Sequence, residues 1–288
     1  MNIRILLTTL IIISLFSEYS VASNFPRYQV TSDFEGNGLM GIFEKLPTSD
    51  GIKVTYKSNS MRKLYSYHIN NMDECGSVDF YPIKGSPFVA IDGSCVGQGS
   101  QIHVYLFIWE KNYSNWCMRR EIVGERADIS ENRFFPSESV SRVVGCTIMG
   151  DTSDISYEDP KIVQAQISNR LKNLKNNKRS VKDFLTPLQD FDIAEITNHL
   201  DDDNVKSAND LAFYMINTSD YYGAGQILSE IVKKFPGRVV AKLNLADAYW
   251  NIDGARNQAK EEYLEYSEQM KNLKEESRIP ARVIERIK

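Results

Sequence analysis

The sequence predicts an α+β protein in which a disulfide-bearing β domain precedes an all-helical domain. Short β-branched and aromatic runs separated by turn dipeptides fill residues 24–150, and helical apolar stripes fill residues 160–288. All four cysteines, Cys75, Cys95, Cys117 and Cys146, lie before the helical region. Many short strands with frequent turn signals favour a sandwich or an open barrel for the N-terminal domain.

The first 22 residues are typical of an export signal. Arg4 precedes an apolar run from Ile5 to Phe16, and Ser20-Val21-Ala22 supplies the small residues that a signal peptidase needs. The run is shorter than the roughly 20 residues of a transmembrane helix. We therefore expect cleavage after Ala22, with retention as an uncleaved anchor as the alternative. The mature protein is expected in the periplasm without stable membrane insertion, and secretion is the second possibility.

Charge is nearly balanced along the chain. There are 34 Lys and Arg residues and 38 Asp and Glu residues, for a net charge of −4. The basic residues are dispersed except for a local cluster at 172–179. The sequence therefore lacks the basic footprint of a nucleic-acid-binding domain.

The four cysteines predict disulfides, because an exported chain with an even cysteine count commonly pairs them. Four cysteines allow three connectivities, and the sequence does not choose among them. We favour Cys75–Cys95 and Cys117–Cys146, since neighbouring segments of a β meander pair at the smallest cost. A zinc site would need close pairs such as C-x-x-C, which the spacing lacks.

The sequence predicts strands at 53–57, 64–69, 77–83, 88–91, 101–109, 117–123 and 142–149, and the strongest of these covers residues 101–109. One face carries Ile102, Val104, Leu106 and Ile108, and the other carries His103, Tyr105, Phe107 and Trp109. Two apolar faces indicate a central strand covered on both sides. The alternative is that Tyr105, Phe107 and Trp109 form a contact surface for a partner, since such aromatics are favoured interface anchors.

A polar, turn-rich stretch at 151–159 predicts a linker between the two domains, and Pro160 is well placed to open a helix. Apolar stripes then predict helical segments within 162–174, 184–191 and 193–200. After these, one helical pattern occurs twice. The first copy contains Ala208, Leu211, Ala212, Met215, Ala224, Leu228, Ile231 and Pro236, and the second contains Leu245, Ala246, Tyr249, Ala259, Tyr263 and Tyr266.

The two copies have a fixed period. Leu211 to Leu245 and Ala212 to Ala246 are both steps of 34 residues (245−211 and 246−212). This period, with small residues at fixed places and Pro236 closing the first unit, resembles the tetratricopeptide repeat. The units would span about 205–238 and 239–273. Lys242, an extra residue before Ala259 and the lack of a second closing proline depart from the pattern.

The resemblance implies a scaffold that binds other proteins. Repeat stacks need about three units to bury a continuous core, so the helical segments before Val205 and after Lys274 are expected to act as caps. In such repeats the first helix of each unit lines the partner groove. This would place Asn209, Phe213, Leu243, Asp247 and Trp250 in the groove, with Phe213 and Trp250 as anchors. The alternative is that both aromatics pack against the capping helices.

Catalytic motifs are not evident. His68, His103 and His199 form no HExxH or other metal-type pair, no G-x-S-x-G occurs, and the oxygen-rich loop 33–38 lacks the ligand spacing of an EF-hand. We therefore expect no cofactor, no metal and no catalytic residue. The leading hypothesis is an envelope adaptor or chaperone-like binder of a protein partner. An immunity-type inhibitor of a toxin delivered to the periplasm is the alternative, and a hydrolase acting on an envelope component is more distant.

Overall fold

The computed structural model describes residues 28–71, 76–131, 133–151, 153–176 and 188–288. The predicted export signal and Cys75 lie outside these ranges. The described strands are β1 (Tyr28–Ser32), β2 (Gly41–Pro47), β3 (Gly51–Ser58), β4 (Lys63–Asn70), β5 (Asp79–Pro82), β6 (Val89–Asp92), β7 (Gln101–Glu110), β8 (Asn115–Glu125) and β9 (Ser137–Arg142). The described α-helices are α1 (Pro160–Asn176), α3 (Asp190–Asn198), α4 (Val205–Asn217), α5 (Tyr221–Lys234), α6 (Val239–Trp250), α7 (Arg256–Asn272) and α8 (Ala281–Arg286), with short 3-10 turns η1 (Ile129–Glu131) and η2 (Glu276–Arg278).

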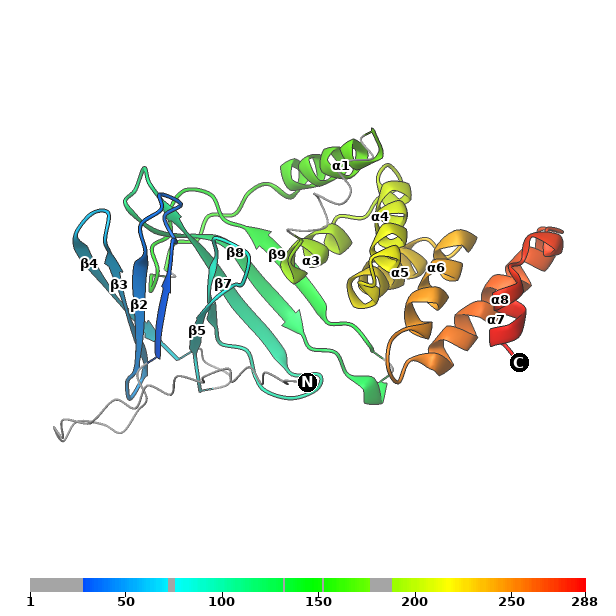
Figure 1. Cartoon of the computed structure of the whole chain (residues 1–288), viewed down its shortest axis with the longest axis horizontal. Helices are drawn as coiled ribbons and strands as arrows, with labels where there is room; N and C mark the ends of the chain where they lie inside the picture. The colour runs from blue at the N-terminus through cyan, green and yellow to red at the C-terminus, as the bar shows by residue number, and fades with distance from the viewer. Residues whose placement is uncertain (1–27, 72–75, 132, 152, 177–187) are drawn as a thin grey trace, which may run out of the picture.

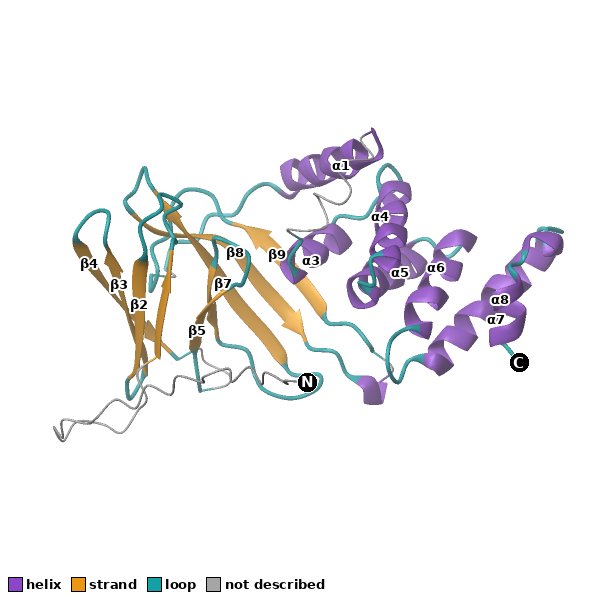
Figure 2. Cartoon of the chain, in the orientation of Figure 1, coloured by secondary structure: helices purple, strands orange, loops and turns teal. Residues whose placement is uncertain are grey.

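The strands form two antiparallel sheets, and the helices follow them along the long axis of the molecule (Figures 1 and 2). Strands β1 to β4 make a four-stranded sheet and β5 to β9 a five-stranded sheet, each in sequence order. The predicted α+β class is confirmed, and both sheets are antiparallel. The two sheets do not close into a barrel, so the open-barrel alternative is not realised.

Aromatic side chains fill the space between the two sheets. Phe43 and Tyr56 from the four-stranded sheet meet Phe80, Phe107 and Trp116 from the five-stranded sheet, and each of these side chains is at most 1% exposed. The ring centroids of Phe43 and Trp116 lie 4.9 Å apart. Because alternate residues of a strand point to opposite faces, each strand contributes one face to this core.

Strand β7 occupies the centre of the five-stranded sheet, between β6 and β8. Its inner face buries Phe107 against the first sheet, and its outer face buries Leu106 against Phe191 and Ala194 of α3. The predicted central strand covered on both sides is therefore confirmed. Strands β1 and β2 were not predicted. The predicted strand at 142–149 was wrong, because regular pairing of β9 ends at Arg142 and only isolated bridges follow.

The residues after β9 are tied to β8 by a disulfide between Cys117 and Cys146, with 4.7 Å between their Cα atoms. This confirms one predicted pair and is consistent with an exported protein. Cys95 is also disulfide-bonded, but its predicted partner, Cys75, lies outside the described residues. The two cysteines are 29 residues apart in the sequence. By restricting the unfolded chain, a disulfide that closes such a loop raises the free energy of unfolding by about 3–4 kcal/mol.

The helices form successive antiparallel pairs. Helix α4 packs on α5, α5 on α6, and α6 on α7, while α4 also contacts α6. Positions 34 residues apart are buried alike, with Leu211 and Leu245 at 1–2% exposure and Ala212 and Ala246 at 0%. Pro160 opens α1 as predicted, and α3 contains Phe191 of the segment expected within 184–191 together with Ile193 and Ile196 of the segment expected within 193–200.

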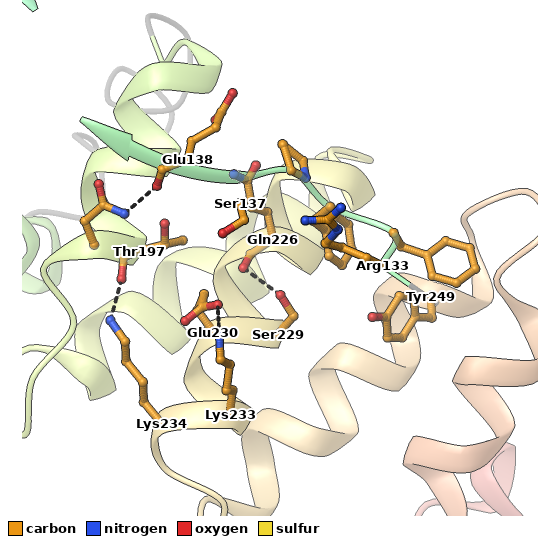
Figure 3. Close-up of a pocket in the computed structure, with 14 residues that line it drawn as sticks. Arg133, Ser137, Glu138, Thr197, Gln226, Ser229, Glu230, Lys233, Lys234 and Tyr249 are labelled. Atoms are coloured by element: carbon orange, nitrogen blue, oxygen red, sulfur yellow. Dashed lines mark hydrogen bonds and ion pairs between the residues drawn. The ribbon is translucent and has the colours of Figure 1, made fainter. Parts of the chain in front are cut away.

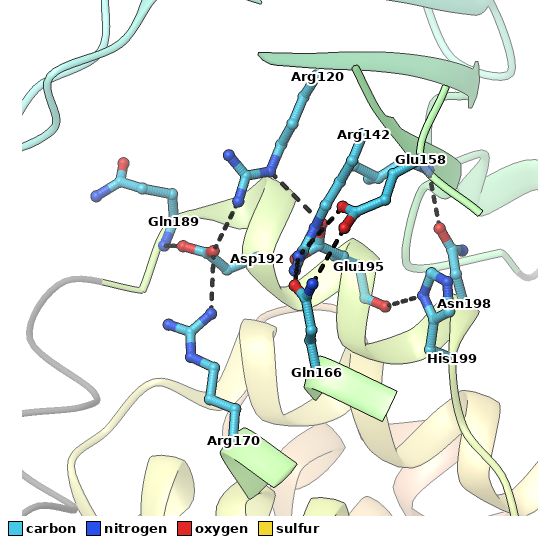
Figure 4. Close-up of polar contacts among 11 residues, drawn as sticks. Arg120, Arg142, Glu158, Gln166, Arg170, Gln189, Asp192, Glu195, Asn198 and His199 are labelled. Atoms are coloured by element: carbon cyan, nitrogen blue, oxygen red, sulfur yellow. Dashed lines mark hydrogen bonds and ion pairs between the residues drawn. The ribbon is translucent and has the colours of Figure 1, made fainter. Parts of the chain in front are cut away.

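A buried cluster of charged residues joins the helices to the five-stranded sheet (Figure 4). Glu195 of α3 is 1% exposed and accepts two hydrogen bonds from Arg142 of β9, at 2.5 and 2.8 Å. Arg120 of β8 lies 3.6 Å from the same carboxylate. Burial alone would raise the pKa of Glu195, but the hydrogen bonds from Arg142 and the charge of Arg120 hold this pKa below its usual value.

The outer edge of β9 is closed by a side chain rather than by another strand. The Asn198 carboxamide accepts a hydrogen bond from the Val140 backbone N–H at 2.8 Å and donates one to the Glu138 carbonyl at 2.7 Å. The carboxamide thus replaces the backbone groups of a neighbouring strand, which protects an edge that could otherwise pair with another chain. The predicted linker also packs here, because the N–H of Glu158 donates to the Arg142 carbonyl.

A second attachment inserts two aromatic residues into the helical core. Phe134 and Phe135, just before β9, are 8% and 7% exposed and contact Tyr249 of α6, each with ring centroids 5.7 Å away. The Phe135 ring also lies against Gly225 of α5, where an added Cβ would stand 2.4 Å from a ring carbon. Glycine at this helical position therefore permits the close approach of the ring.

We predict that Glu195→Ala lowers the free energy of unfolding by about 3–5 kcal/mol, because it leaves two guanidinium groups without their buried carboxylate. Urea denaturation followed by circular dichroism measures the change. Glu158→Ala is the control. Its carboxylate lies 3.9 Å from Arg142 and is 21% exposed, so we expect a loss of at most about 1 kcal/mol. Equal losses for the two variants would contradict a dominant role for Glu195.

We predict that Gly225→Ala destabilises the protein by about 1–3 kcal/mol, because the new methyl group overpacks the Phe135 ring. The same change at an unobstructed helical position would stabilise by roughly 0.5–1 kcal/mol. Thermal unfolding of a double-mutant cycle with Phe135→Ala provides the test. Once the ring is removed, Gly225→Ala should become neutral or stabilising; a penalty that persists without the ring would show that Phe135 is not its cause.

Candidate functional site

The first helices of the two hairpins and the terminal helix lie side by side. Asn244 of α6 donates a hydrogen bond to Asn209 of α4 at 3.2 Å, and Arg282 of α8 donates to Asp247 of α6 at 2.7 Å. The face formed by α4, α6 and α8 is hereafter the first-helix face. The five groove residues predicted from the sequence belong to two of these helices, Asn209 and Phe213 to α4 and Leu243, Asp247 and Trp250 to α6.

The C-terminal end of this face is occupied by the chain itself. Asp247 accepts hydrogen bonds from Arg282, Arg286 and Tyr263, at 2.7, 2.9 and 2.6 Å. The indole of Trp250 is approached by the guanidinium groups of Arg286 and Arg256, at 4.8 and 5.5 Å from the ring centroid. Such cation–π contacts hold an aromatic ring in place. Asp247 and Trp250 therefore already have partners within the protein.

The N-terminal end of the first-helix face is open. Phe213 is 47% exposed and the neighbouring Tyr214 is 41% exposed, with their ring centroids 6.0 Å apart. Leu243 is half-buried against the helical core. Two adjacent aromatic side chains with large exposed fractions are the kind of residue that anchors protein interfaces.

The aromatic residues of β7 lie in the core. Tyr105, Phe107 and Trp109 are 8%, 0% and 7% exposed, and all three belong to the aromatic cluster between the sheets. Trp109 packs edge-on against Tyr65 with ring centroids 5.3 Å apart. The sequence left two roles open for these residues, packing in the core and contact with a partner. In the structure they pack in the core.

A cleft of about 470 Å³ lies where the loop before β9 crosses the helices (Figure 3). Sequence reasoning missed it, because its walls come from segments that lie 59 residues apart or more (197−138). One wall is the loop and the start of β9, and the other is formed by α5 and the end of α3. The lining residues are Arg133, Phe134, Phe135, Pro136, Ser137, Glu138, Thr197, Asn198, Gln226, Ser229, Glu230, Lys233, Lys234 and Tyr249.

The cleft combines charges of both signs with an aromatic wall. Lys233 pairs with Glu230 at 3.0 Å, and Lys234 donates to the Thr197 carbonyl at 2.9 Å. Tyr249 and Phe135 supply stacked rings. A mixed polar lining of this kind can hydrogen-bond a polar polypeptide segment, whose backbone offers donors and acceptors in equal number. The consecutive pair Phe134-Phe135, in an otherwise polar stretch, is the one sequence signal that could have pointed to this junction.

Glu138 has the most perturbed acidic group of the cleft. Burial, reinforced by the negative charge of Asp190, raises its pKa to about 7, and a hydrogen bond with Gln226 only partly offsets this rise. Glu138 and Gln226 also line a second hollow beyond the cleft, together with Tyr222 and Arg126. The carboxyl group thus lies between two hollows at the junction of sheet and helices.

The other polar residues noted in the sequence have local partners. In the loop 33–38, Asp33 accepts hydrogen bonds from the backbone N–H groups of Asn37 and Gly38, at 3.0 and 2.9 Å. His103 lies 2.9 Å from Glu121, and His199 lies 2.9 Å from the Glu195 carbonyl. Within the ranges that the structure describes, no group of three or more His, Cys, Asp and Glu residues is arranged to hold a metal ion. No helix in those ranges is long and apolar enough to cross a bilayer.

We predict that stability falls as the pH rises from about 4.5 to 7 in part because of Glu138. In this window the unfolded chain has lost the proton that folded Glu138 retains, so deprotonation favours unfolding. Glu138→Gln should leave stability unchanged at pH 4 and raise it by about 1–3 kcal/mol at pH 8. Burial also raises the pKa of Glu262 to about 7, so Glu262→Gln serves as a comparison variant. In that variant the loss of stability with rising pH that Glu138 causes should remain. An unaltered pH profile for Glu138→Gln would refute the assignment.

Comparison with known proteins does not identify this chain. Searches with family models, against curated proteins and against solved structures, found no match.

Proposed function

We propose that this protein is an exported, non-enzymatic module that binds a protein partner, and that its helical hairpins are tetratricopeptide-like repeats. The proposal rests on the 34-residue period and on the matching burial of Leu211 with Leu245 and of Ala212 with Ala246. Contacts of α4 with α6, in addition to those within each hairpin, are the packing expected when such units stack.

The observation that carries the proposal is the exposed aromatic pair on α4. Phe213 and Tyr214 of α4 are 47% and 41% exposed to solvent. Burial of large aromatic side chains at the centre of an interface can contribute roughly 2 kcal/mol or more each. We assign the anchor role to Phe213. Trp250 and Asp247 instead hold α8 in place, and Arg282 and Arg286 supply that contact.

The second candidate function is an immunity-type inhibitor of a toxin delivered to the periplasm. The double attachment of helices to sheet, through Glu195 and through Phe135, favours it. A surface that is already fixed before binding loses little conformational entropy on association, which suits tight stoichiometric inhibition. An adaptor or chaperone-like binder uses the same surface with weaker or broader specificity.

The test is affinity capture from a periplasmic extract, followed by titration with the identified partner. Phe213→Ala should weaken binding by about 30-fold or more, with an unchanged melting temperature. Leu264→Ala, at a 53% exposed position on α7, is the matched control and should bind normally. Trp250→Ala should lower the melting temperature but leave the affinity of the folded protein nearly unchanged.

A third variant separates the first-helix face from the cleft. Ser229→Trp places a large ring in the cleft and leaves α4 unaltered. Normal binding by this variant, with weak binding by Phe213→Ala, supports the first-helix face. The reverse pattern would move the partner site to the cleft, and a partner that is chemically converted by the protein would overturn the non-enzymatic assignment.

A further inference from the structure

Three loops meet at the end of the sandwich that lies farthest from the C-terminal helices (upper left in Figure 1). They are the β1–β2 connection at 33–40, the β3–β4 hairpin with the start of β4 at 59–64, and the β7–β8 hairpin at 111–114. These three segments are hereafter the loop end.

Buried contacts hold the loop end together. Glu35 in the first loop accepts hydrogen bonds from Tyr56 and Ser58 at 2.7 and 2.5 Å, and from Ser60 of the β3–β4 hairpin. Phe34 packs against Trp116, directly after the third loop, with ring centroids 5.8 Å apart. The loops are thus fixed relative to one another by the sandwich core.

The loop end exposes an unusual number of large apolar side chains. Leu64 is 65% exposed, Tyr113 56%, Leu39 51%, Met40 48% and Met61 44%. Four of them lie on the loops themselves, and Leu64 lies at the start of β4. Scattered apolar residues are normal on protein surfaces, but a concentration on neighbouring loop tips indicates a binding surface.

The cations of the loop end are free to bind an anion. A hollow of about 420 Å³ is lined by Lys57, Arg62 and Lys63, together with Asn59 and Leu64, so three of its five lining residues are cations and none is acidic. A fourth exposed cation, Lys111, lies on the third loop. Within the part of the chain that the structure describes, none of these four cations forms an ion pair; Lys63 only lies over the Tyr65 ring.

Among the residues that the structure describes, the carboxylates of the first loop form no ion pair with the three cations of the hollow, although the pKa of Asp33 is lowered mainly by backbone hydrogen bonds and to a smaller extent by the charge of Lys111. Asp33 is engaged by two backbone N–H groups, and Glu35 is 8% exposed and bonded by hydroxyl groups. Glu110, at the base of the third loop, pairs with Arg119. The loop end therefore combines unpaired positive charge with protruding apolar tips.

We propose that the loop end docks on the surface of an anionic phospholipid bilayer. The hollow of Lys57, Arg62 and Lys63 takes a headgroup phosphate, while Leu39, Met61 and Tyr113 enter the boundary between headgroups and acyl chains. Basic residues beside apolar ones are the combination that peripheral membrane binding uses, since each contributes a separate part of the affinity. An acidic protein surface would complement the cations but would leave the apolar tips in water.

The test is cosedimentation of the purified protein with vesicles of phosphatidylcholine alone and with vesicles that also contain about 30% phosphatidylglycerol, since only the second kind has a negative surface potential. The protein should bind the anionic vesicles and should dissociate in high salt. Arg62→Asn with Lys63→Gln should weaken binding by about 25-fold, at about 5-fold for each cation removed. Lys172→Gln with Lys271→Gln, which removes two exposed cations from helices, is the matched control and should bind normally.

The apolar contribution is tested separately. Leu39→Ser with Tyr113→Ser should weaken vesicle binding while Val96→Ser, at a 96% exposed position outside the loop end, should not. Melting curves confirm that all variants are folded. A Tyr113→Trp reporter should be quenched by vesicles with brominated acyl chains.

Three results would overturn the proposal. The first is equal binding to neutral and anionic vesicles, and the second is binding that neither loop-end variant weakens. The third is binding of soluble polyglutamate or of inorganic phosphate without binding of vesicles, which would assign the cations to an acidic protein or to a free anion.

Discussion

The buried carboxylate of Glu195 is the contact on which the joining of sheet and helices depends. Two adjacent strands present Arg142 and Arg120 to it, and the neighbouring turn of α3 inserts Phe191 into the apolar outer face of the same sheet. Burying these charges costs solvation free energy, which only a close bidentate geometry can offset. The pair therefore specifies where α3 lies. Because α3 packs on α5, it also positions the helices that follow.

One attachment would leave the helices free to rotate about it, and the Phe134-Phe135 insertion supplies the second. Both attachments involve β9. Arg142 at its end contacts Glu195 of α3, and Phe135 just before its start packs against Gly225 of α5. The cleft shown in Figure 3 lies between these two attachments. It is a consequence of how the parts are joined, so a ligand that fills it would also strengthen the junction between sheet and helices.

Local patterns account for what could be predicted. The helical period, the opening of α1 by Pro160 and the two apolar faces of β7 are all written in consecutive residues. Strands β1 and β2 escaped notice because β1 is largely exposed and is defined by its pairing with β2 rather than by an apolar face. The stretch 142–149 carries strand-like residues, yet Cys146 is committed to a disulfide and Gly145 adopts a positive φ of 71°, which interrupts regular pairing.

The functional surfaces were harder to predict, for a different reason. Periodicity gives the face of a helix on which a residue lies but not what covers that face. Phe213 and Trp250 were equivalent candidates in the sequence. The structure separates them, because Arg286 and Arg256 approach Trp250 while Phe213 keeps 47% of its surface exposed. The Glu195–Arg142 contact spans 53 residues, and in the sequence Glu195 resembled any charge on a solvated helix.

The long axis of the molecule relates the two proposed surfaces. The loop end lies at one extremity, and the helices that carry the first-helix face extend toward the other (Figure 1). The loop tips point across the long axis in the view of Figure 1, so a bilayer in contact with them would leave the helical hairpins to one side of the docked loops. Confinement to a surface raises the local concentration of a protein near membrane-associated partners, so docking would increase capture without any new contact to the partner. The attachments through Glu195 and Phe135 would then fix the orientation of the helices relative to the docked loop end.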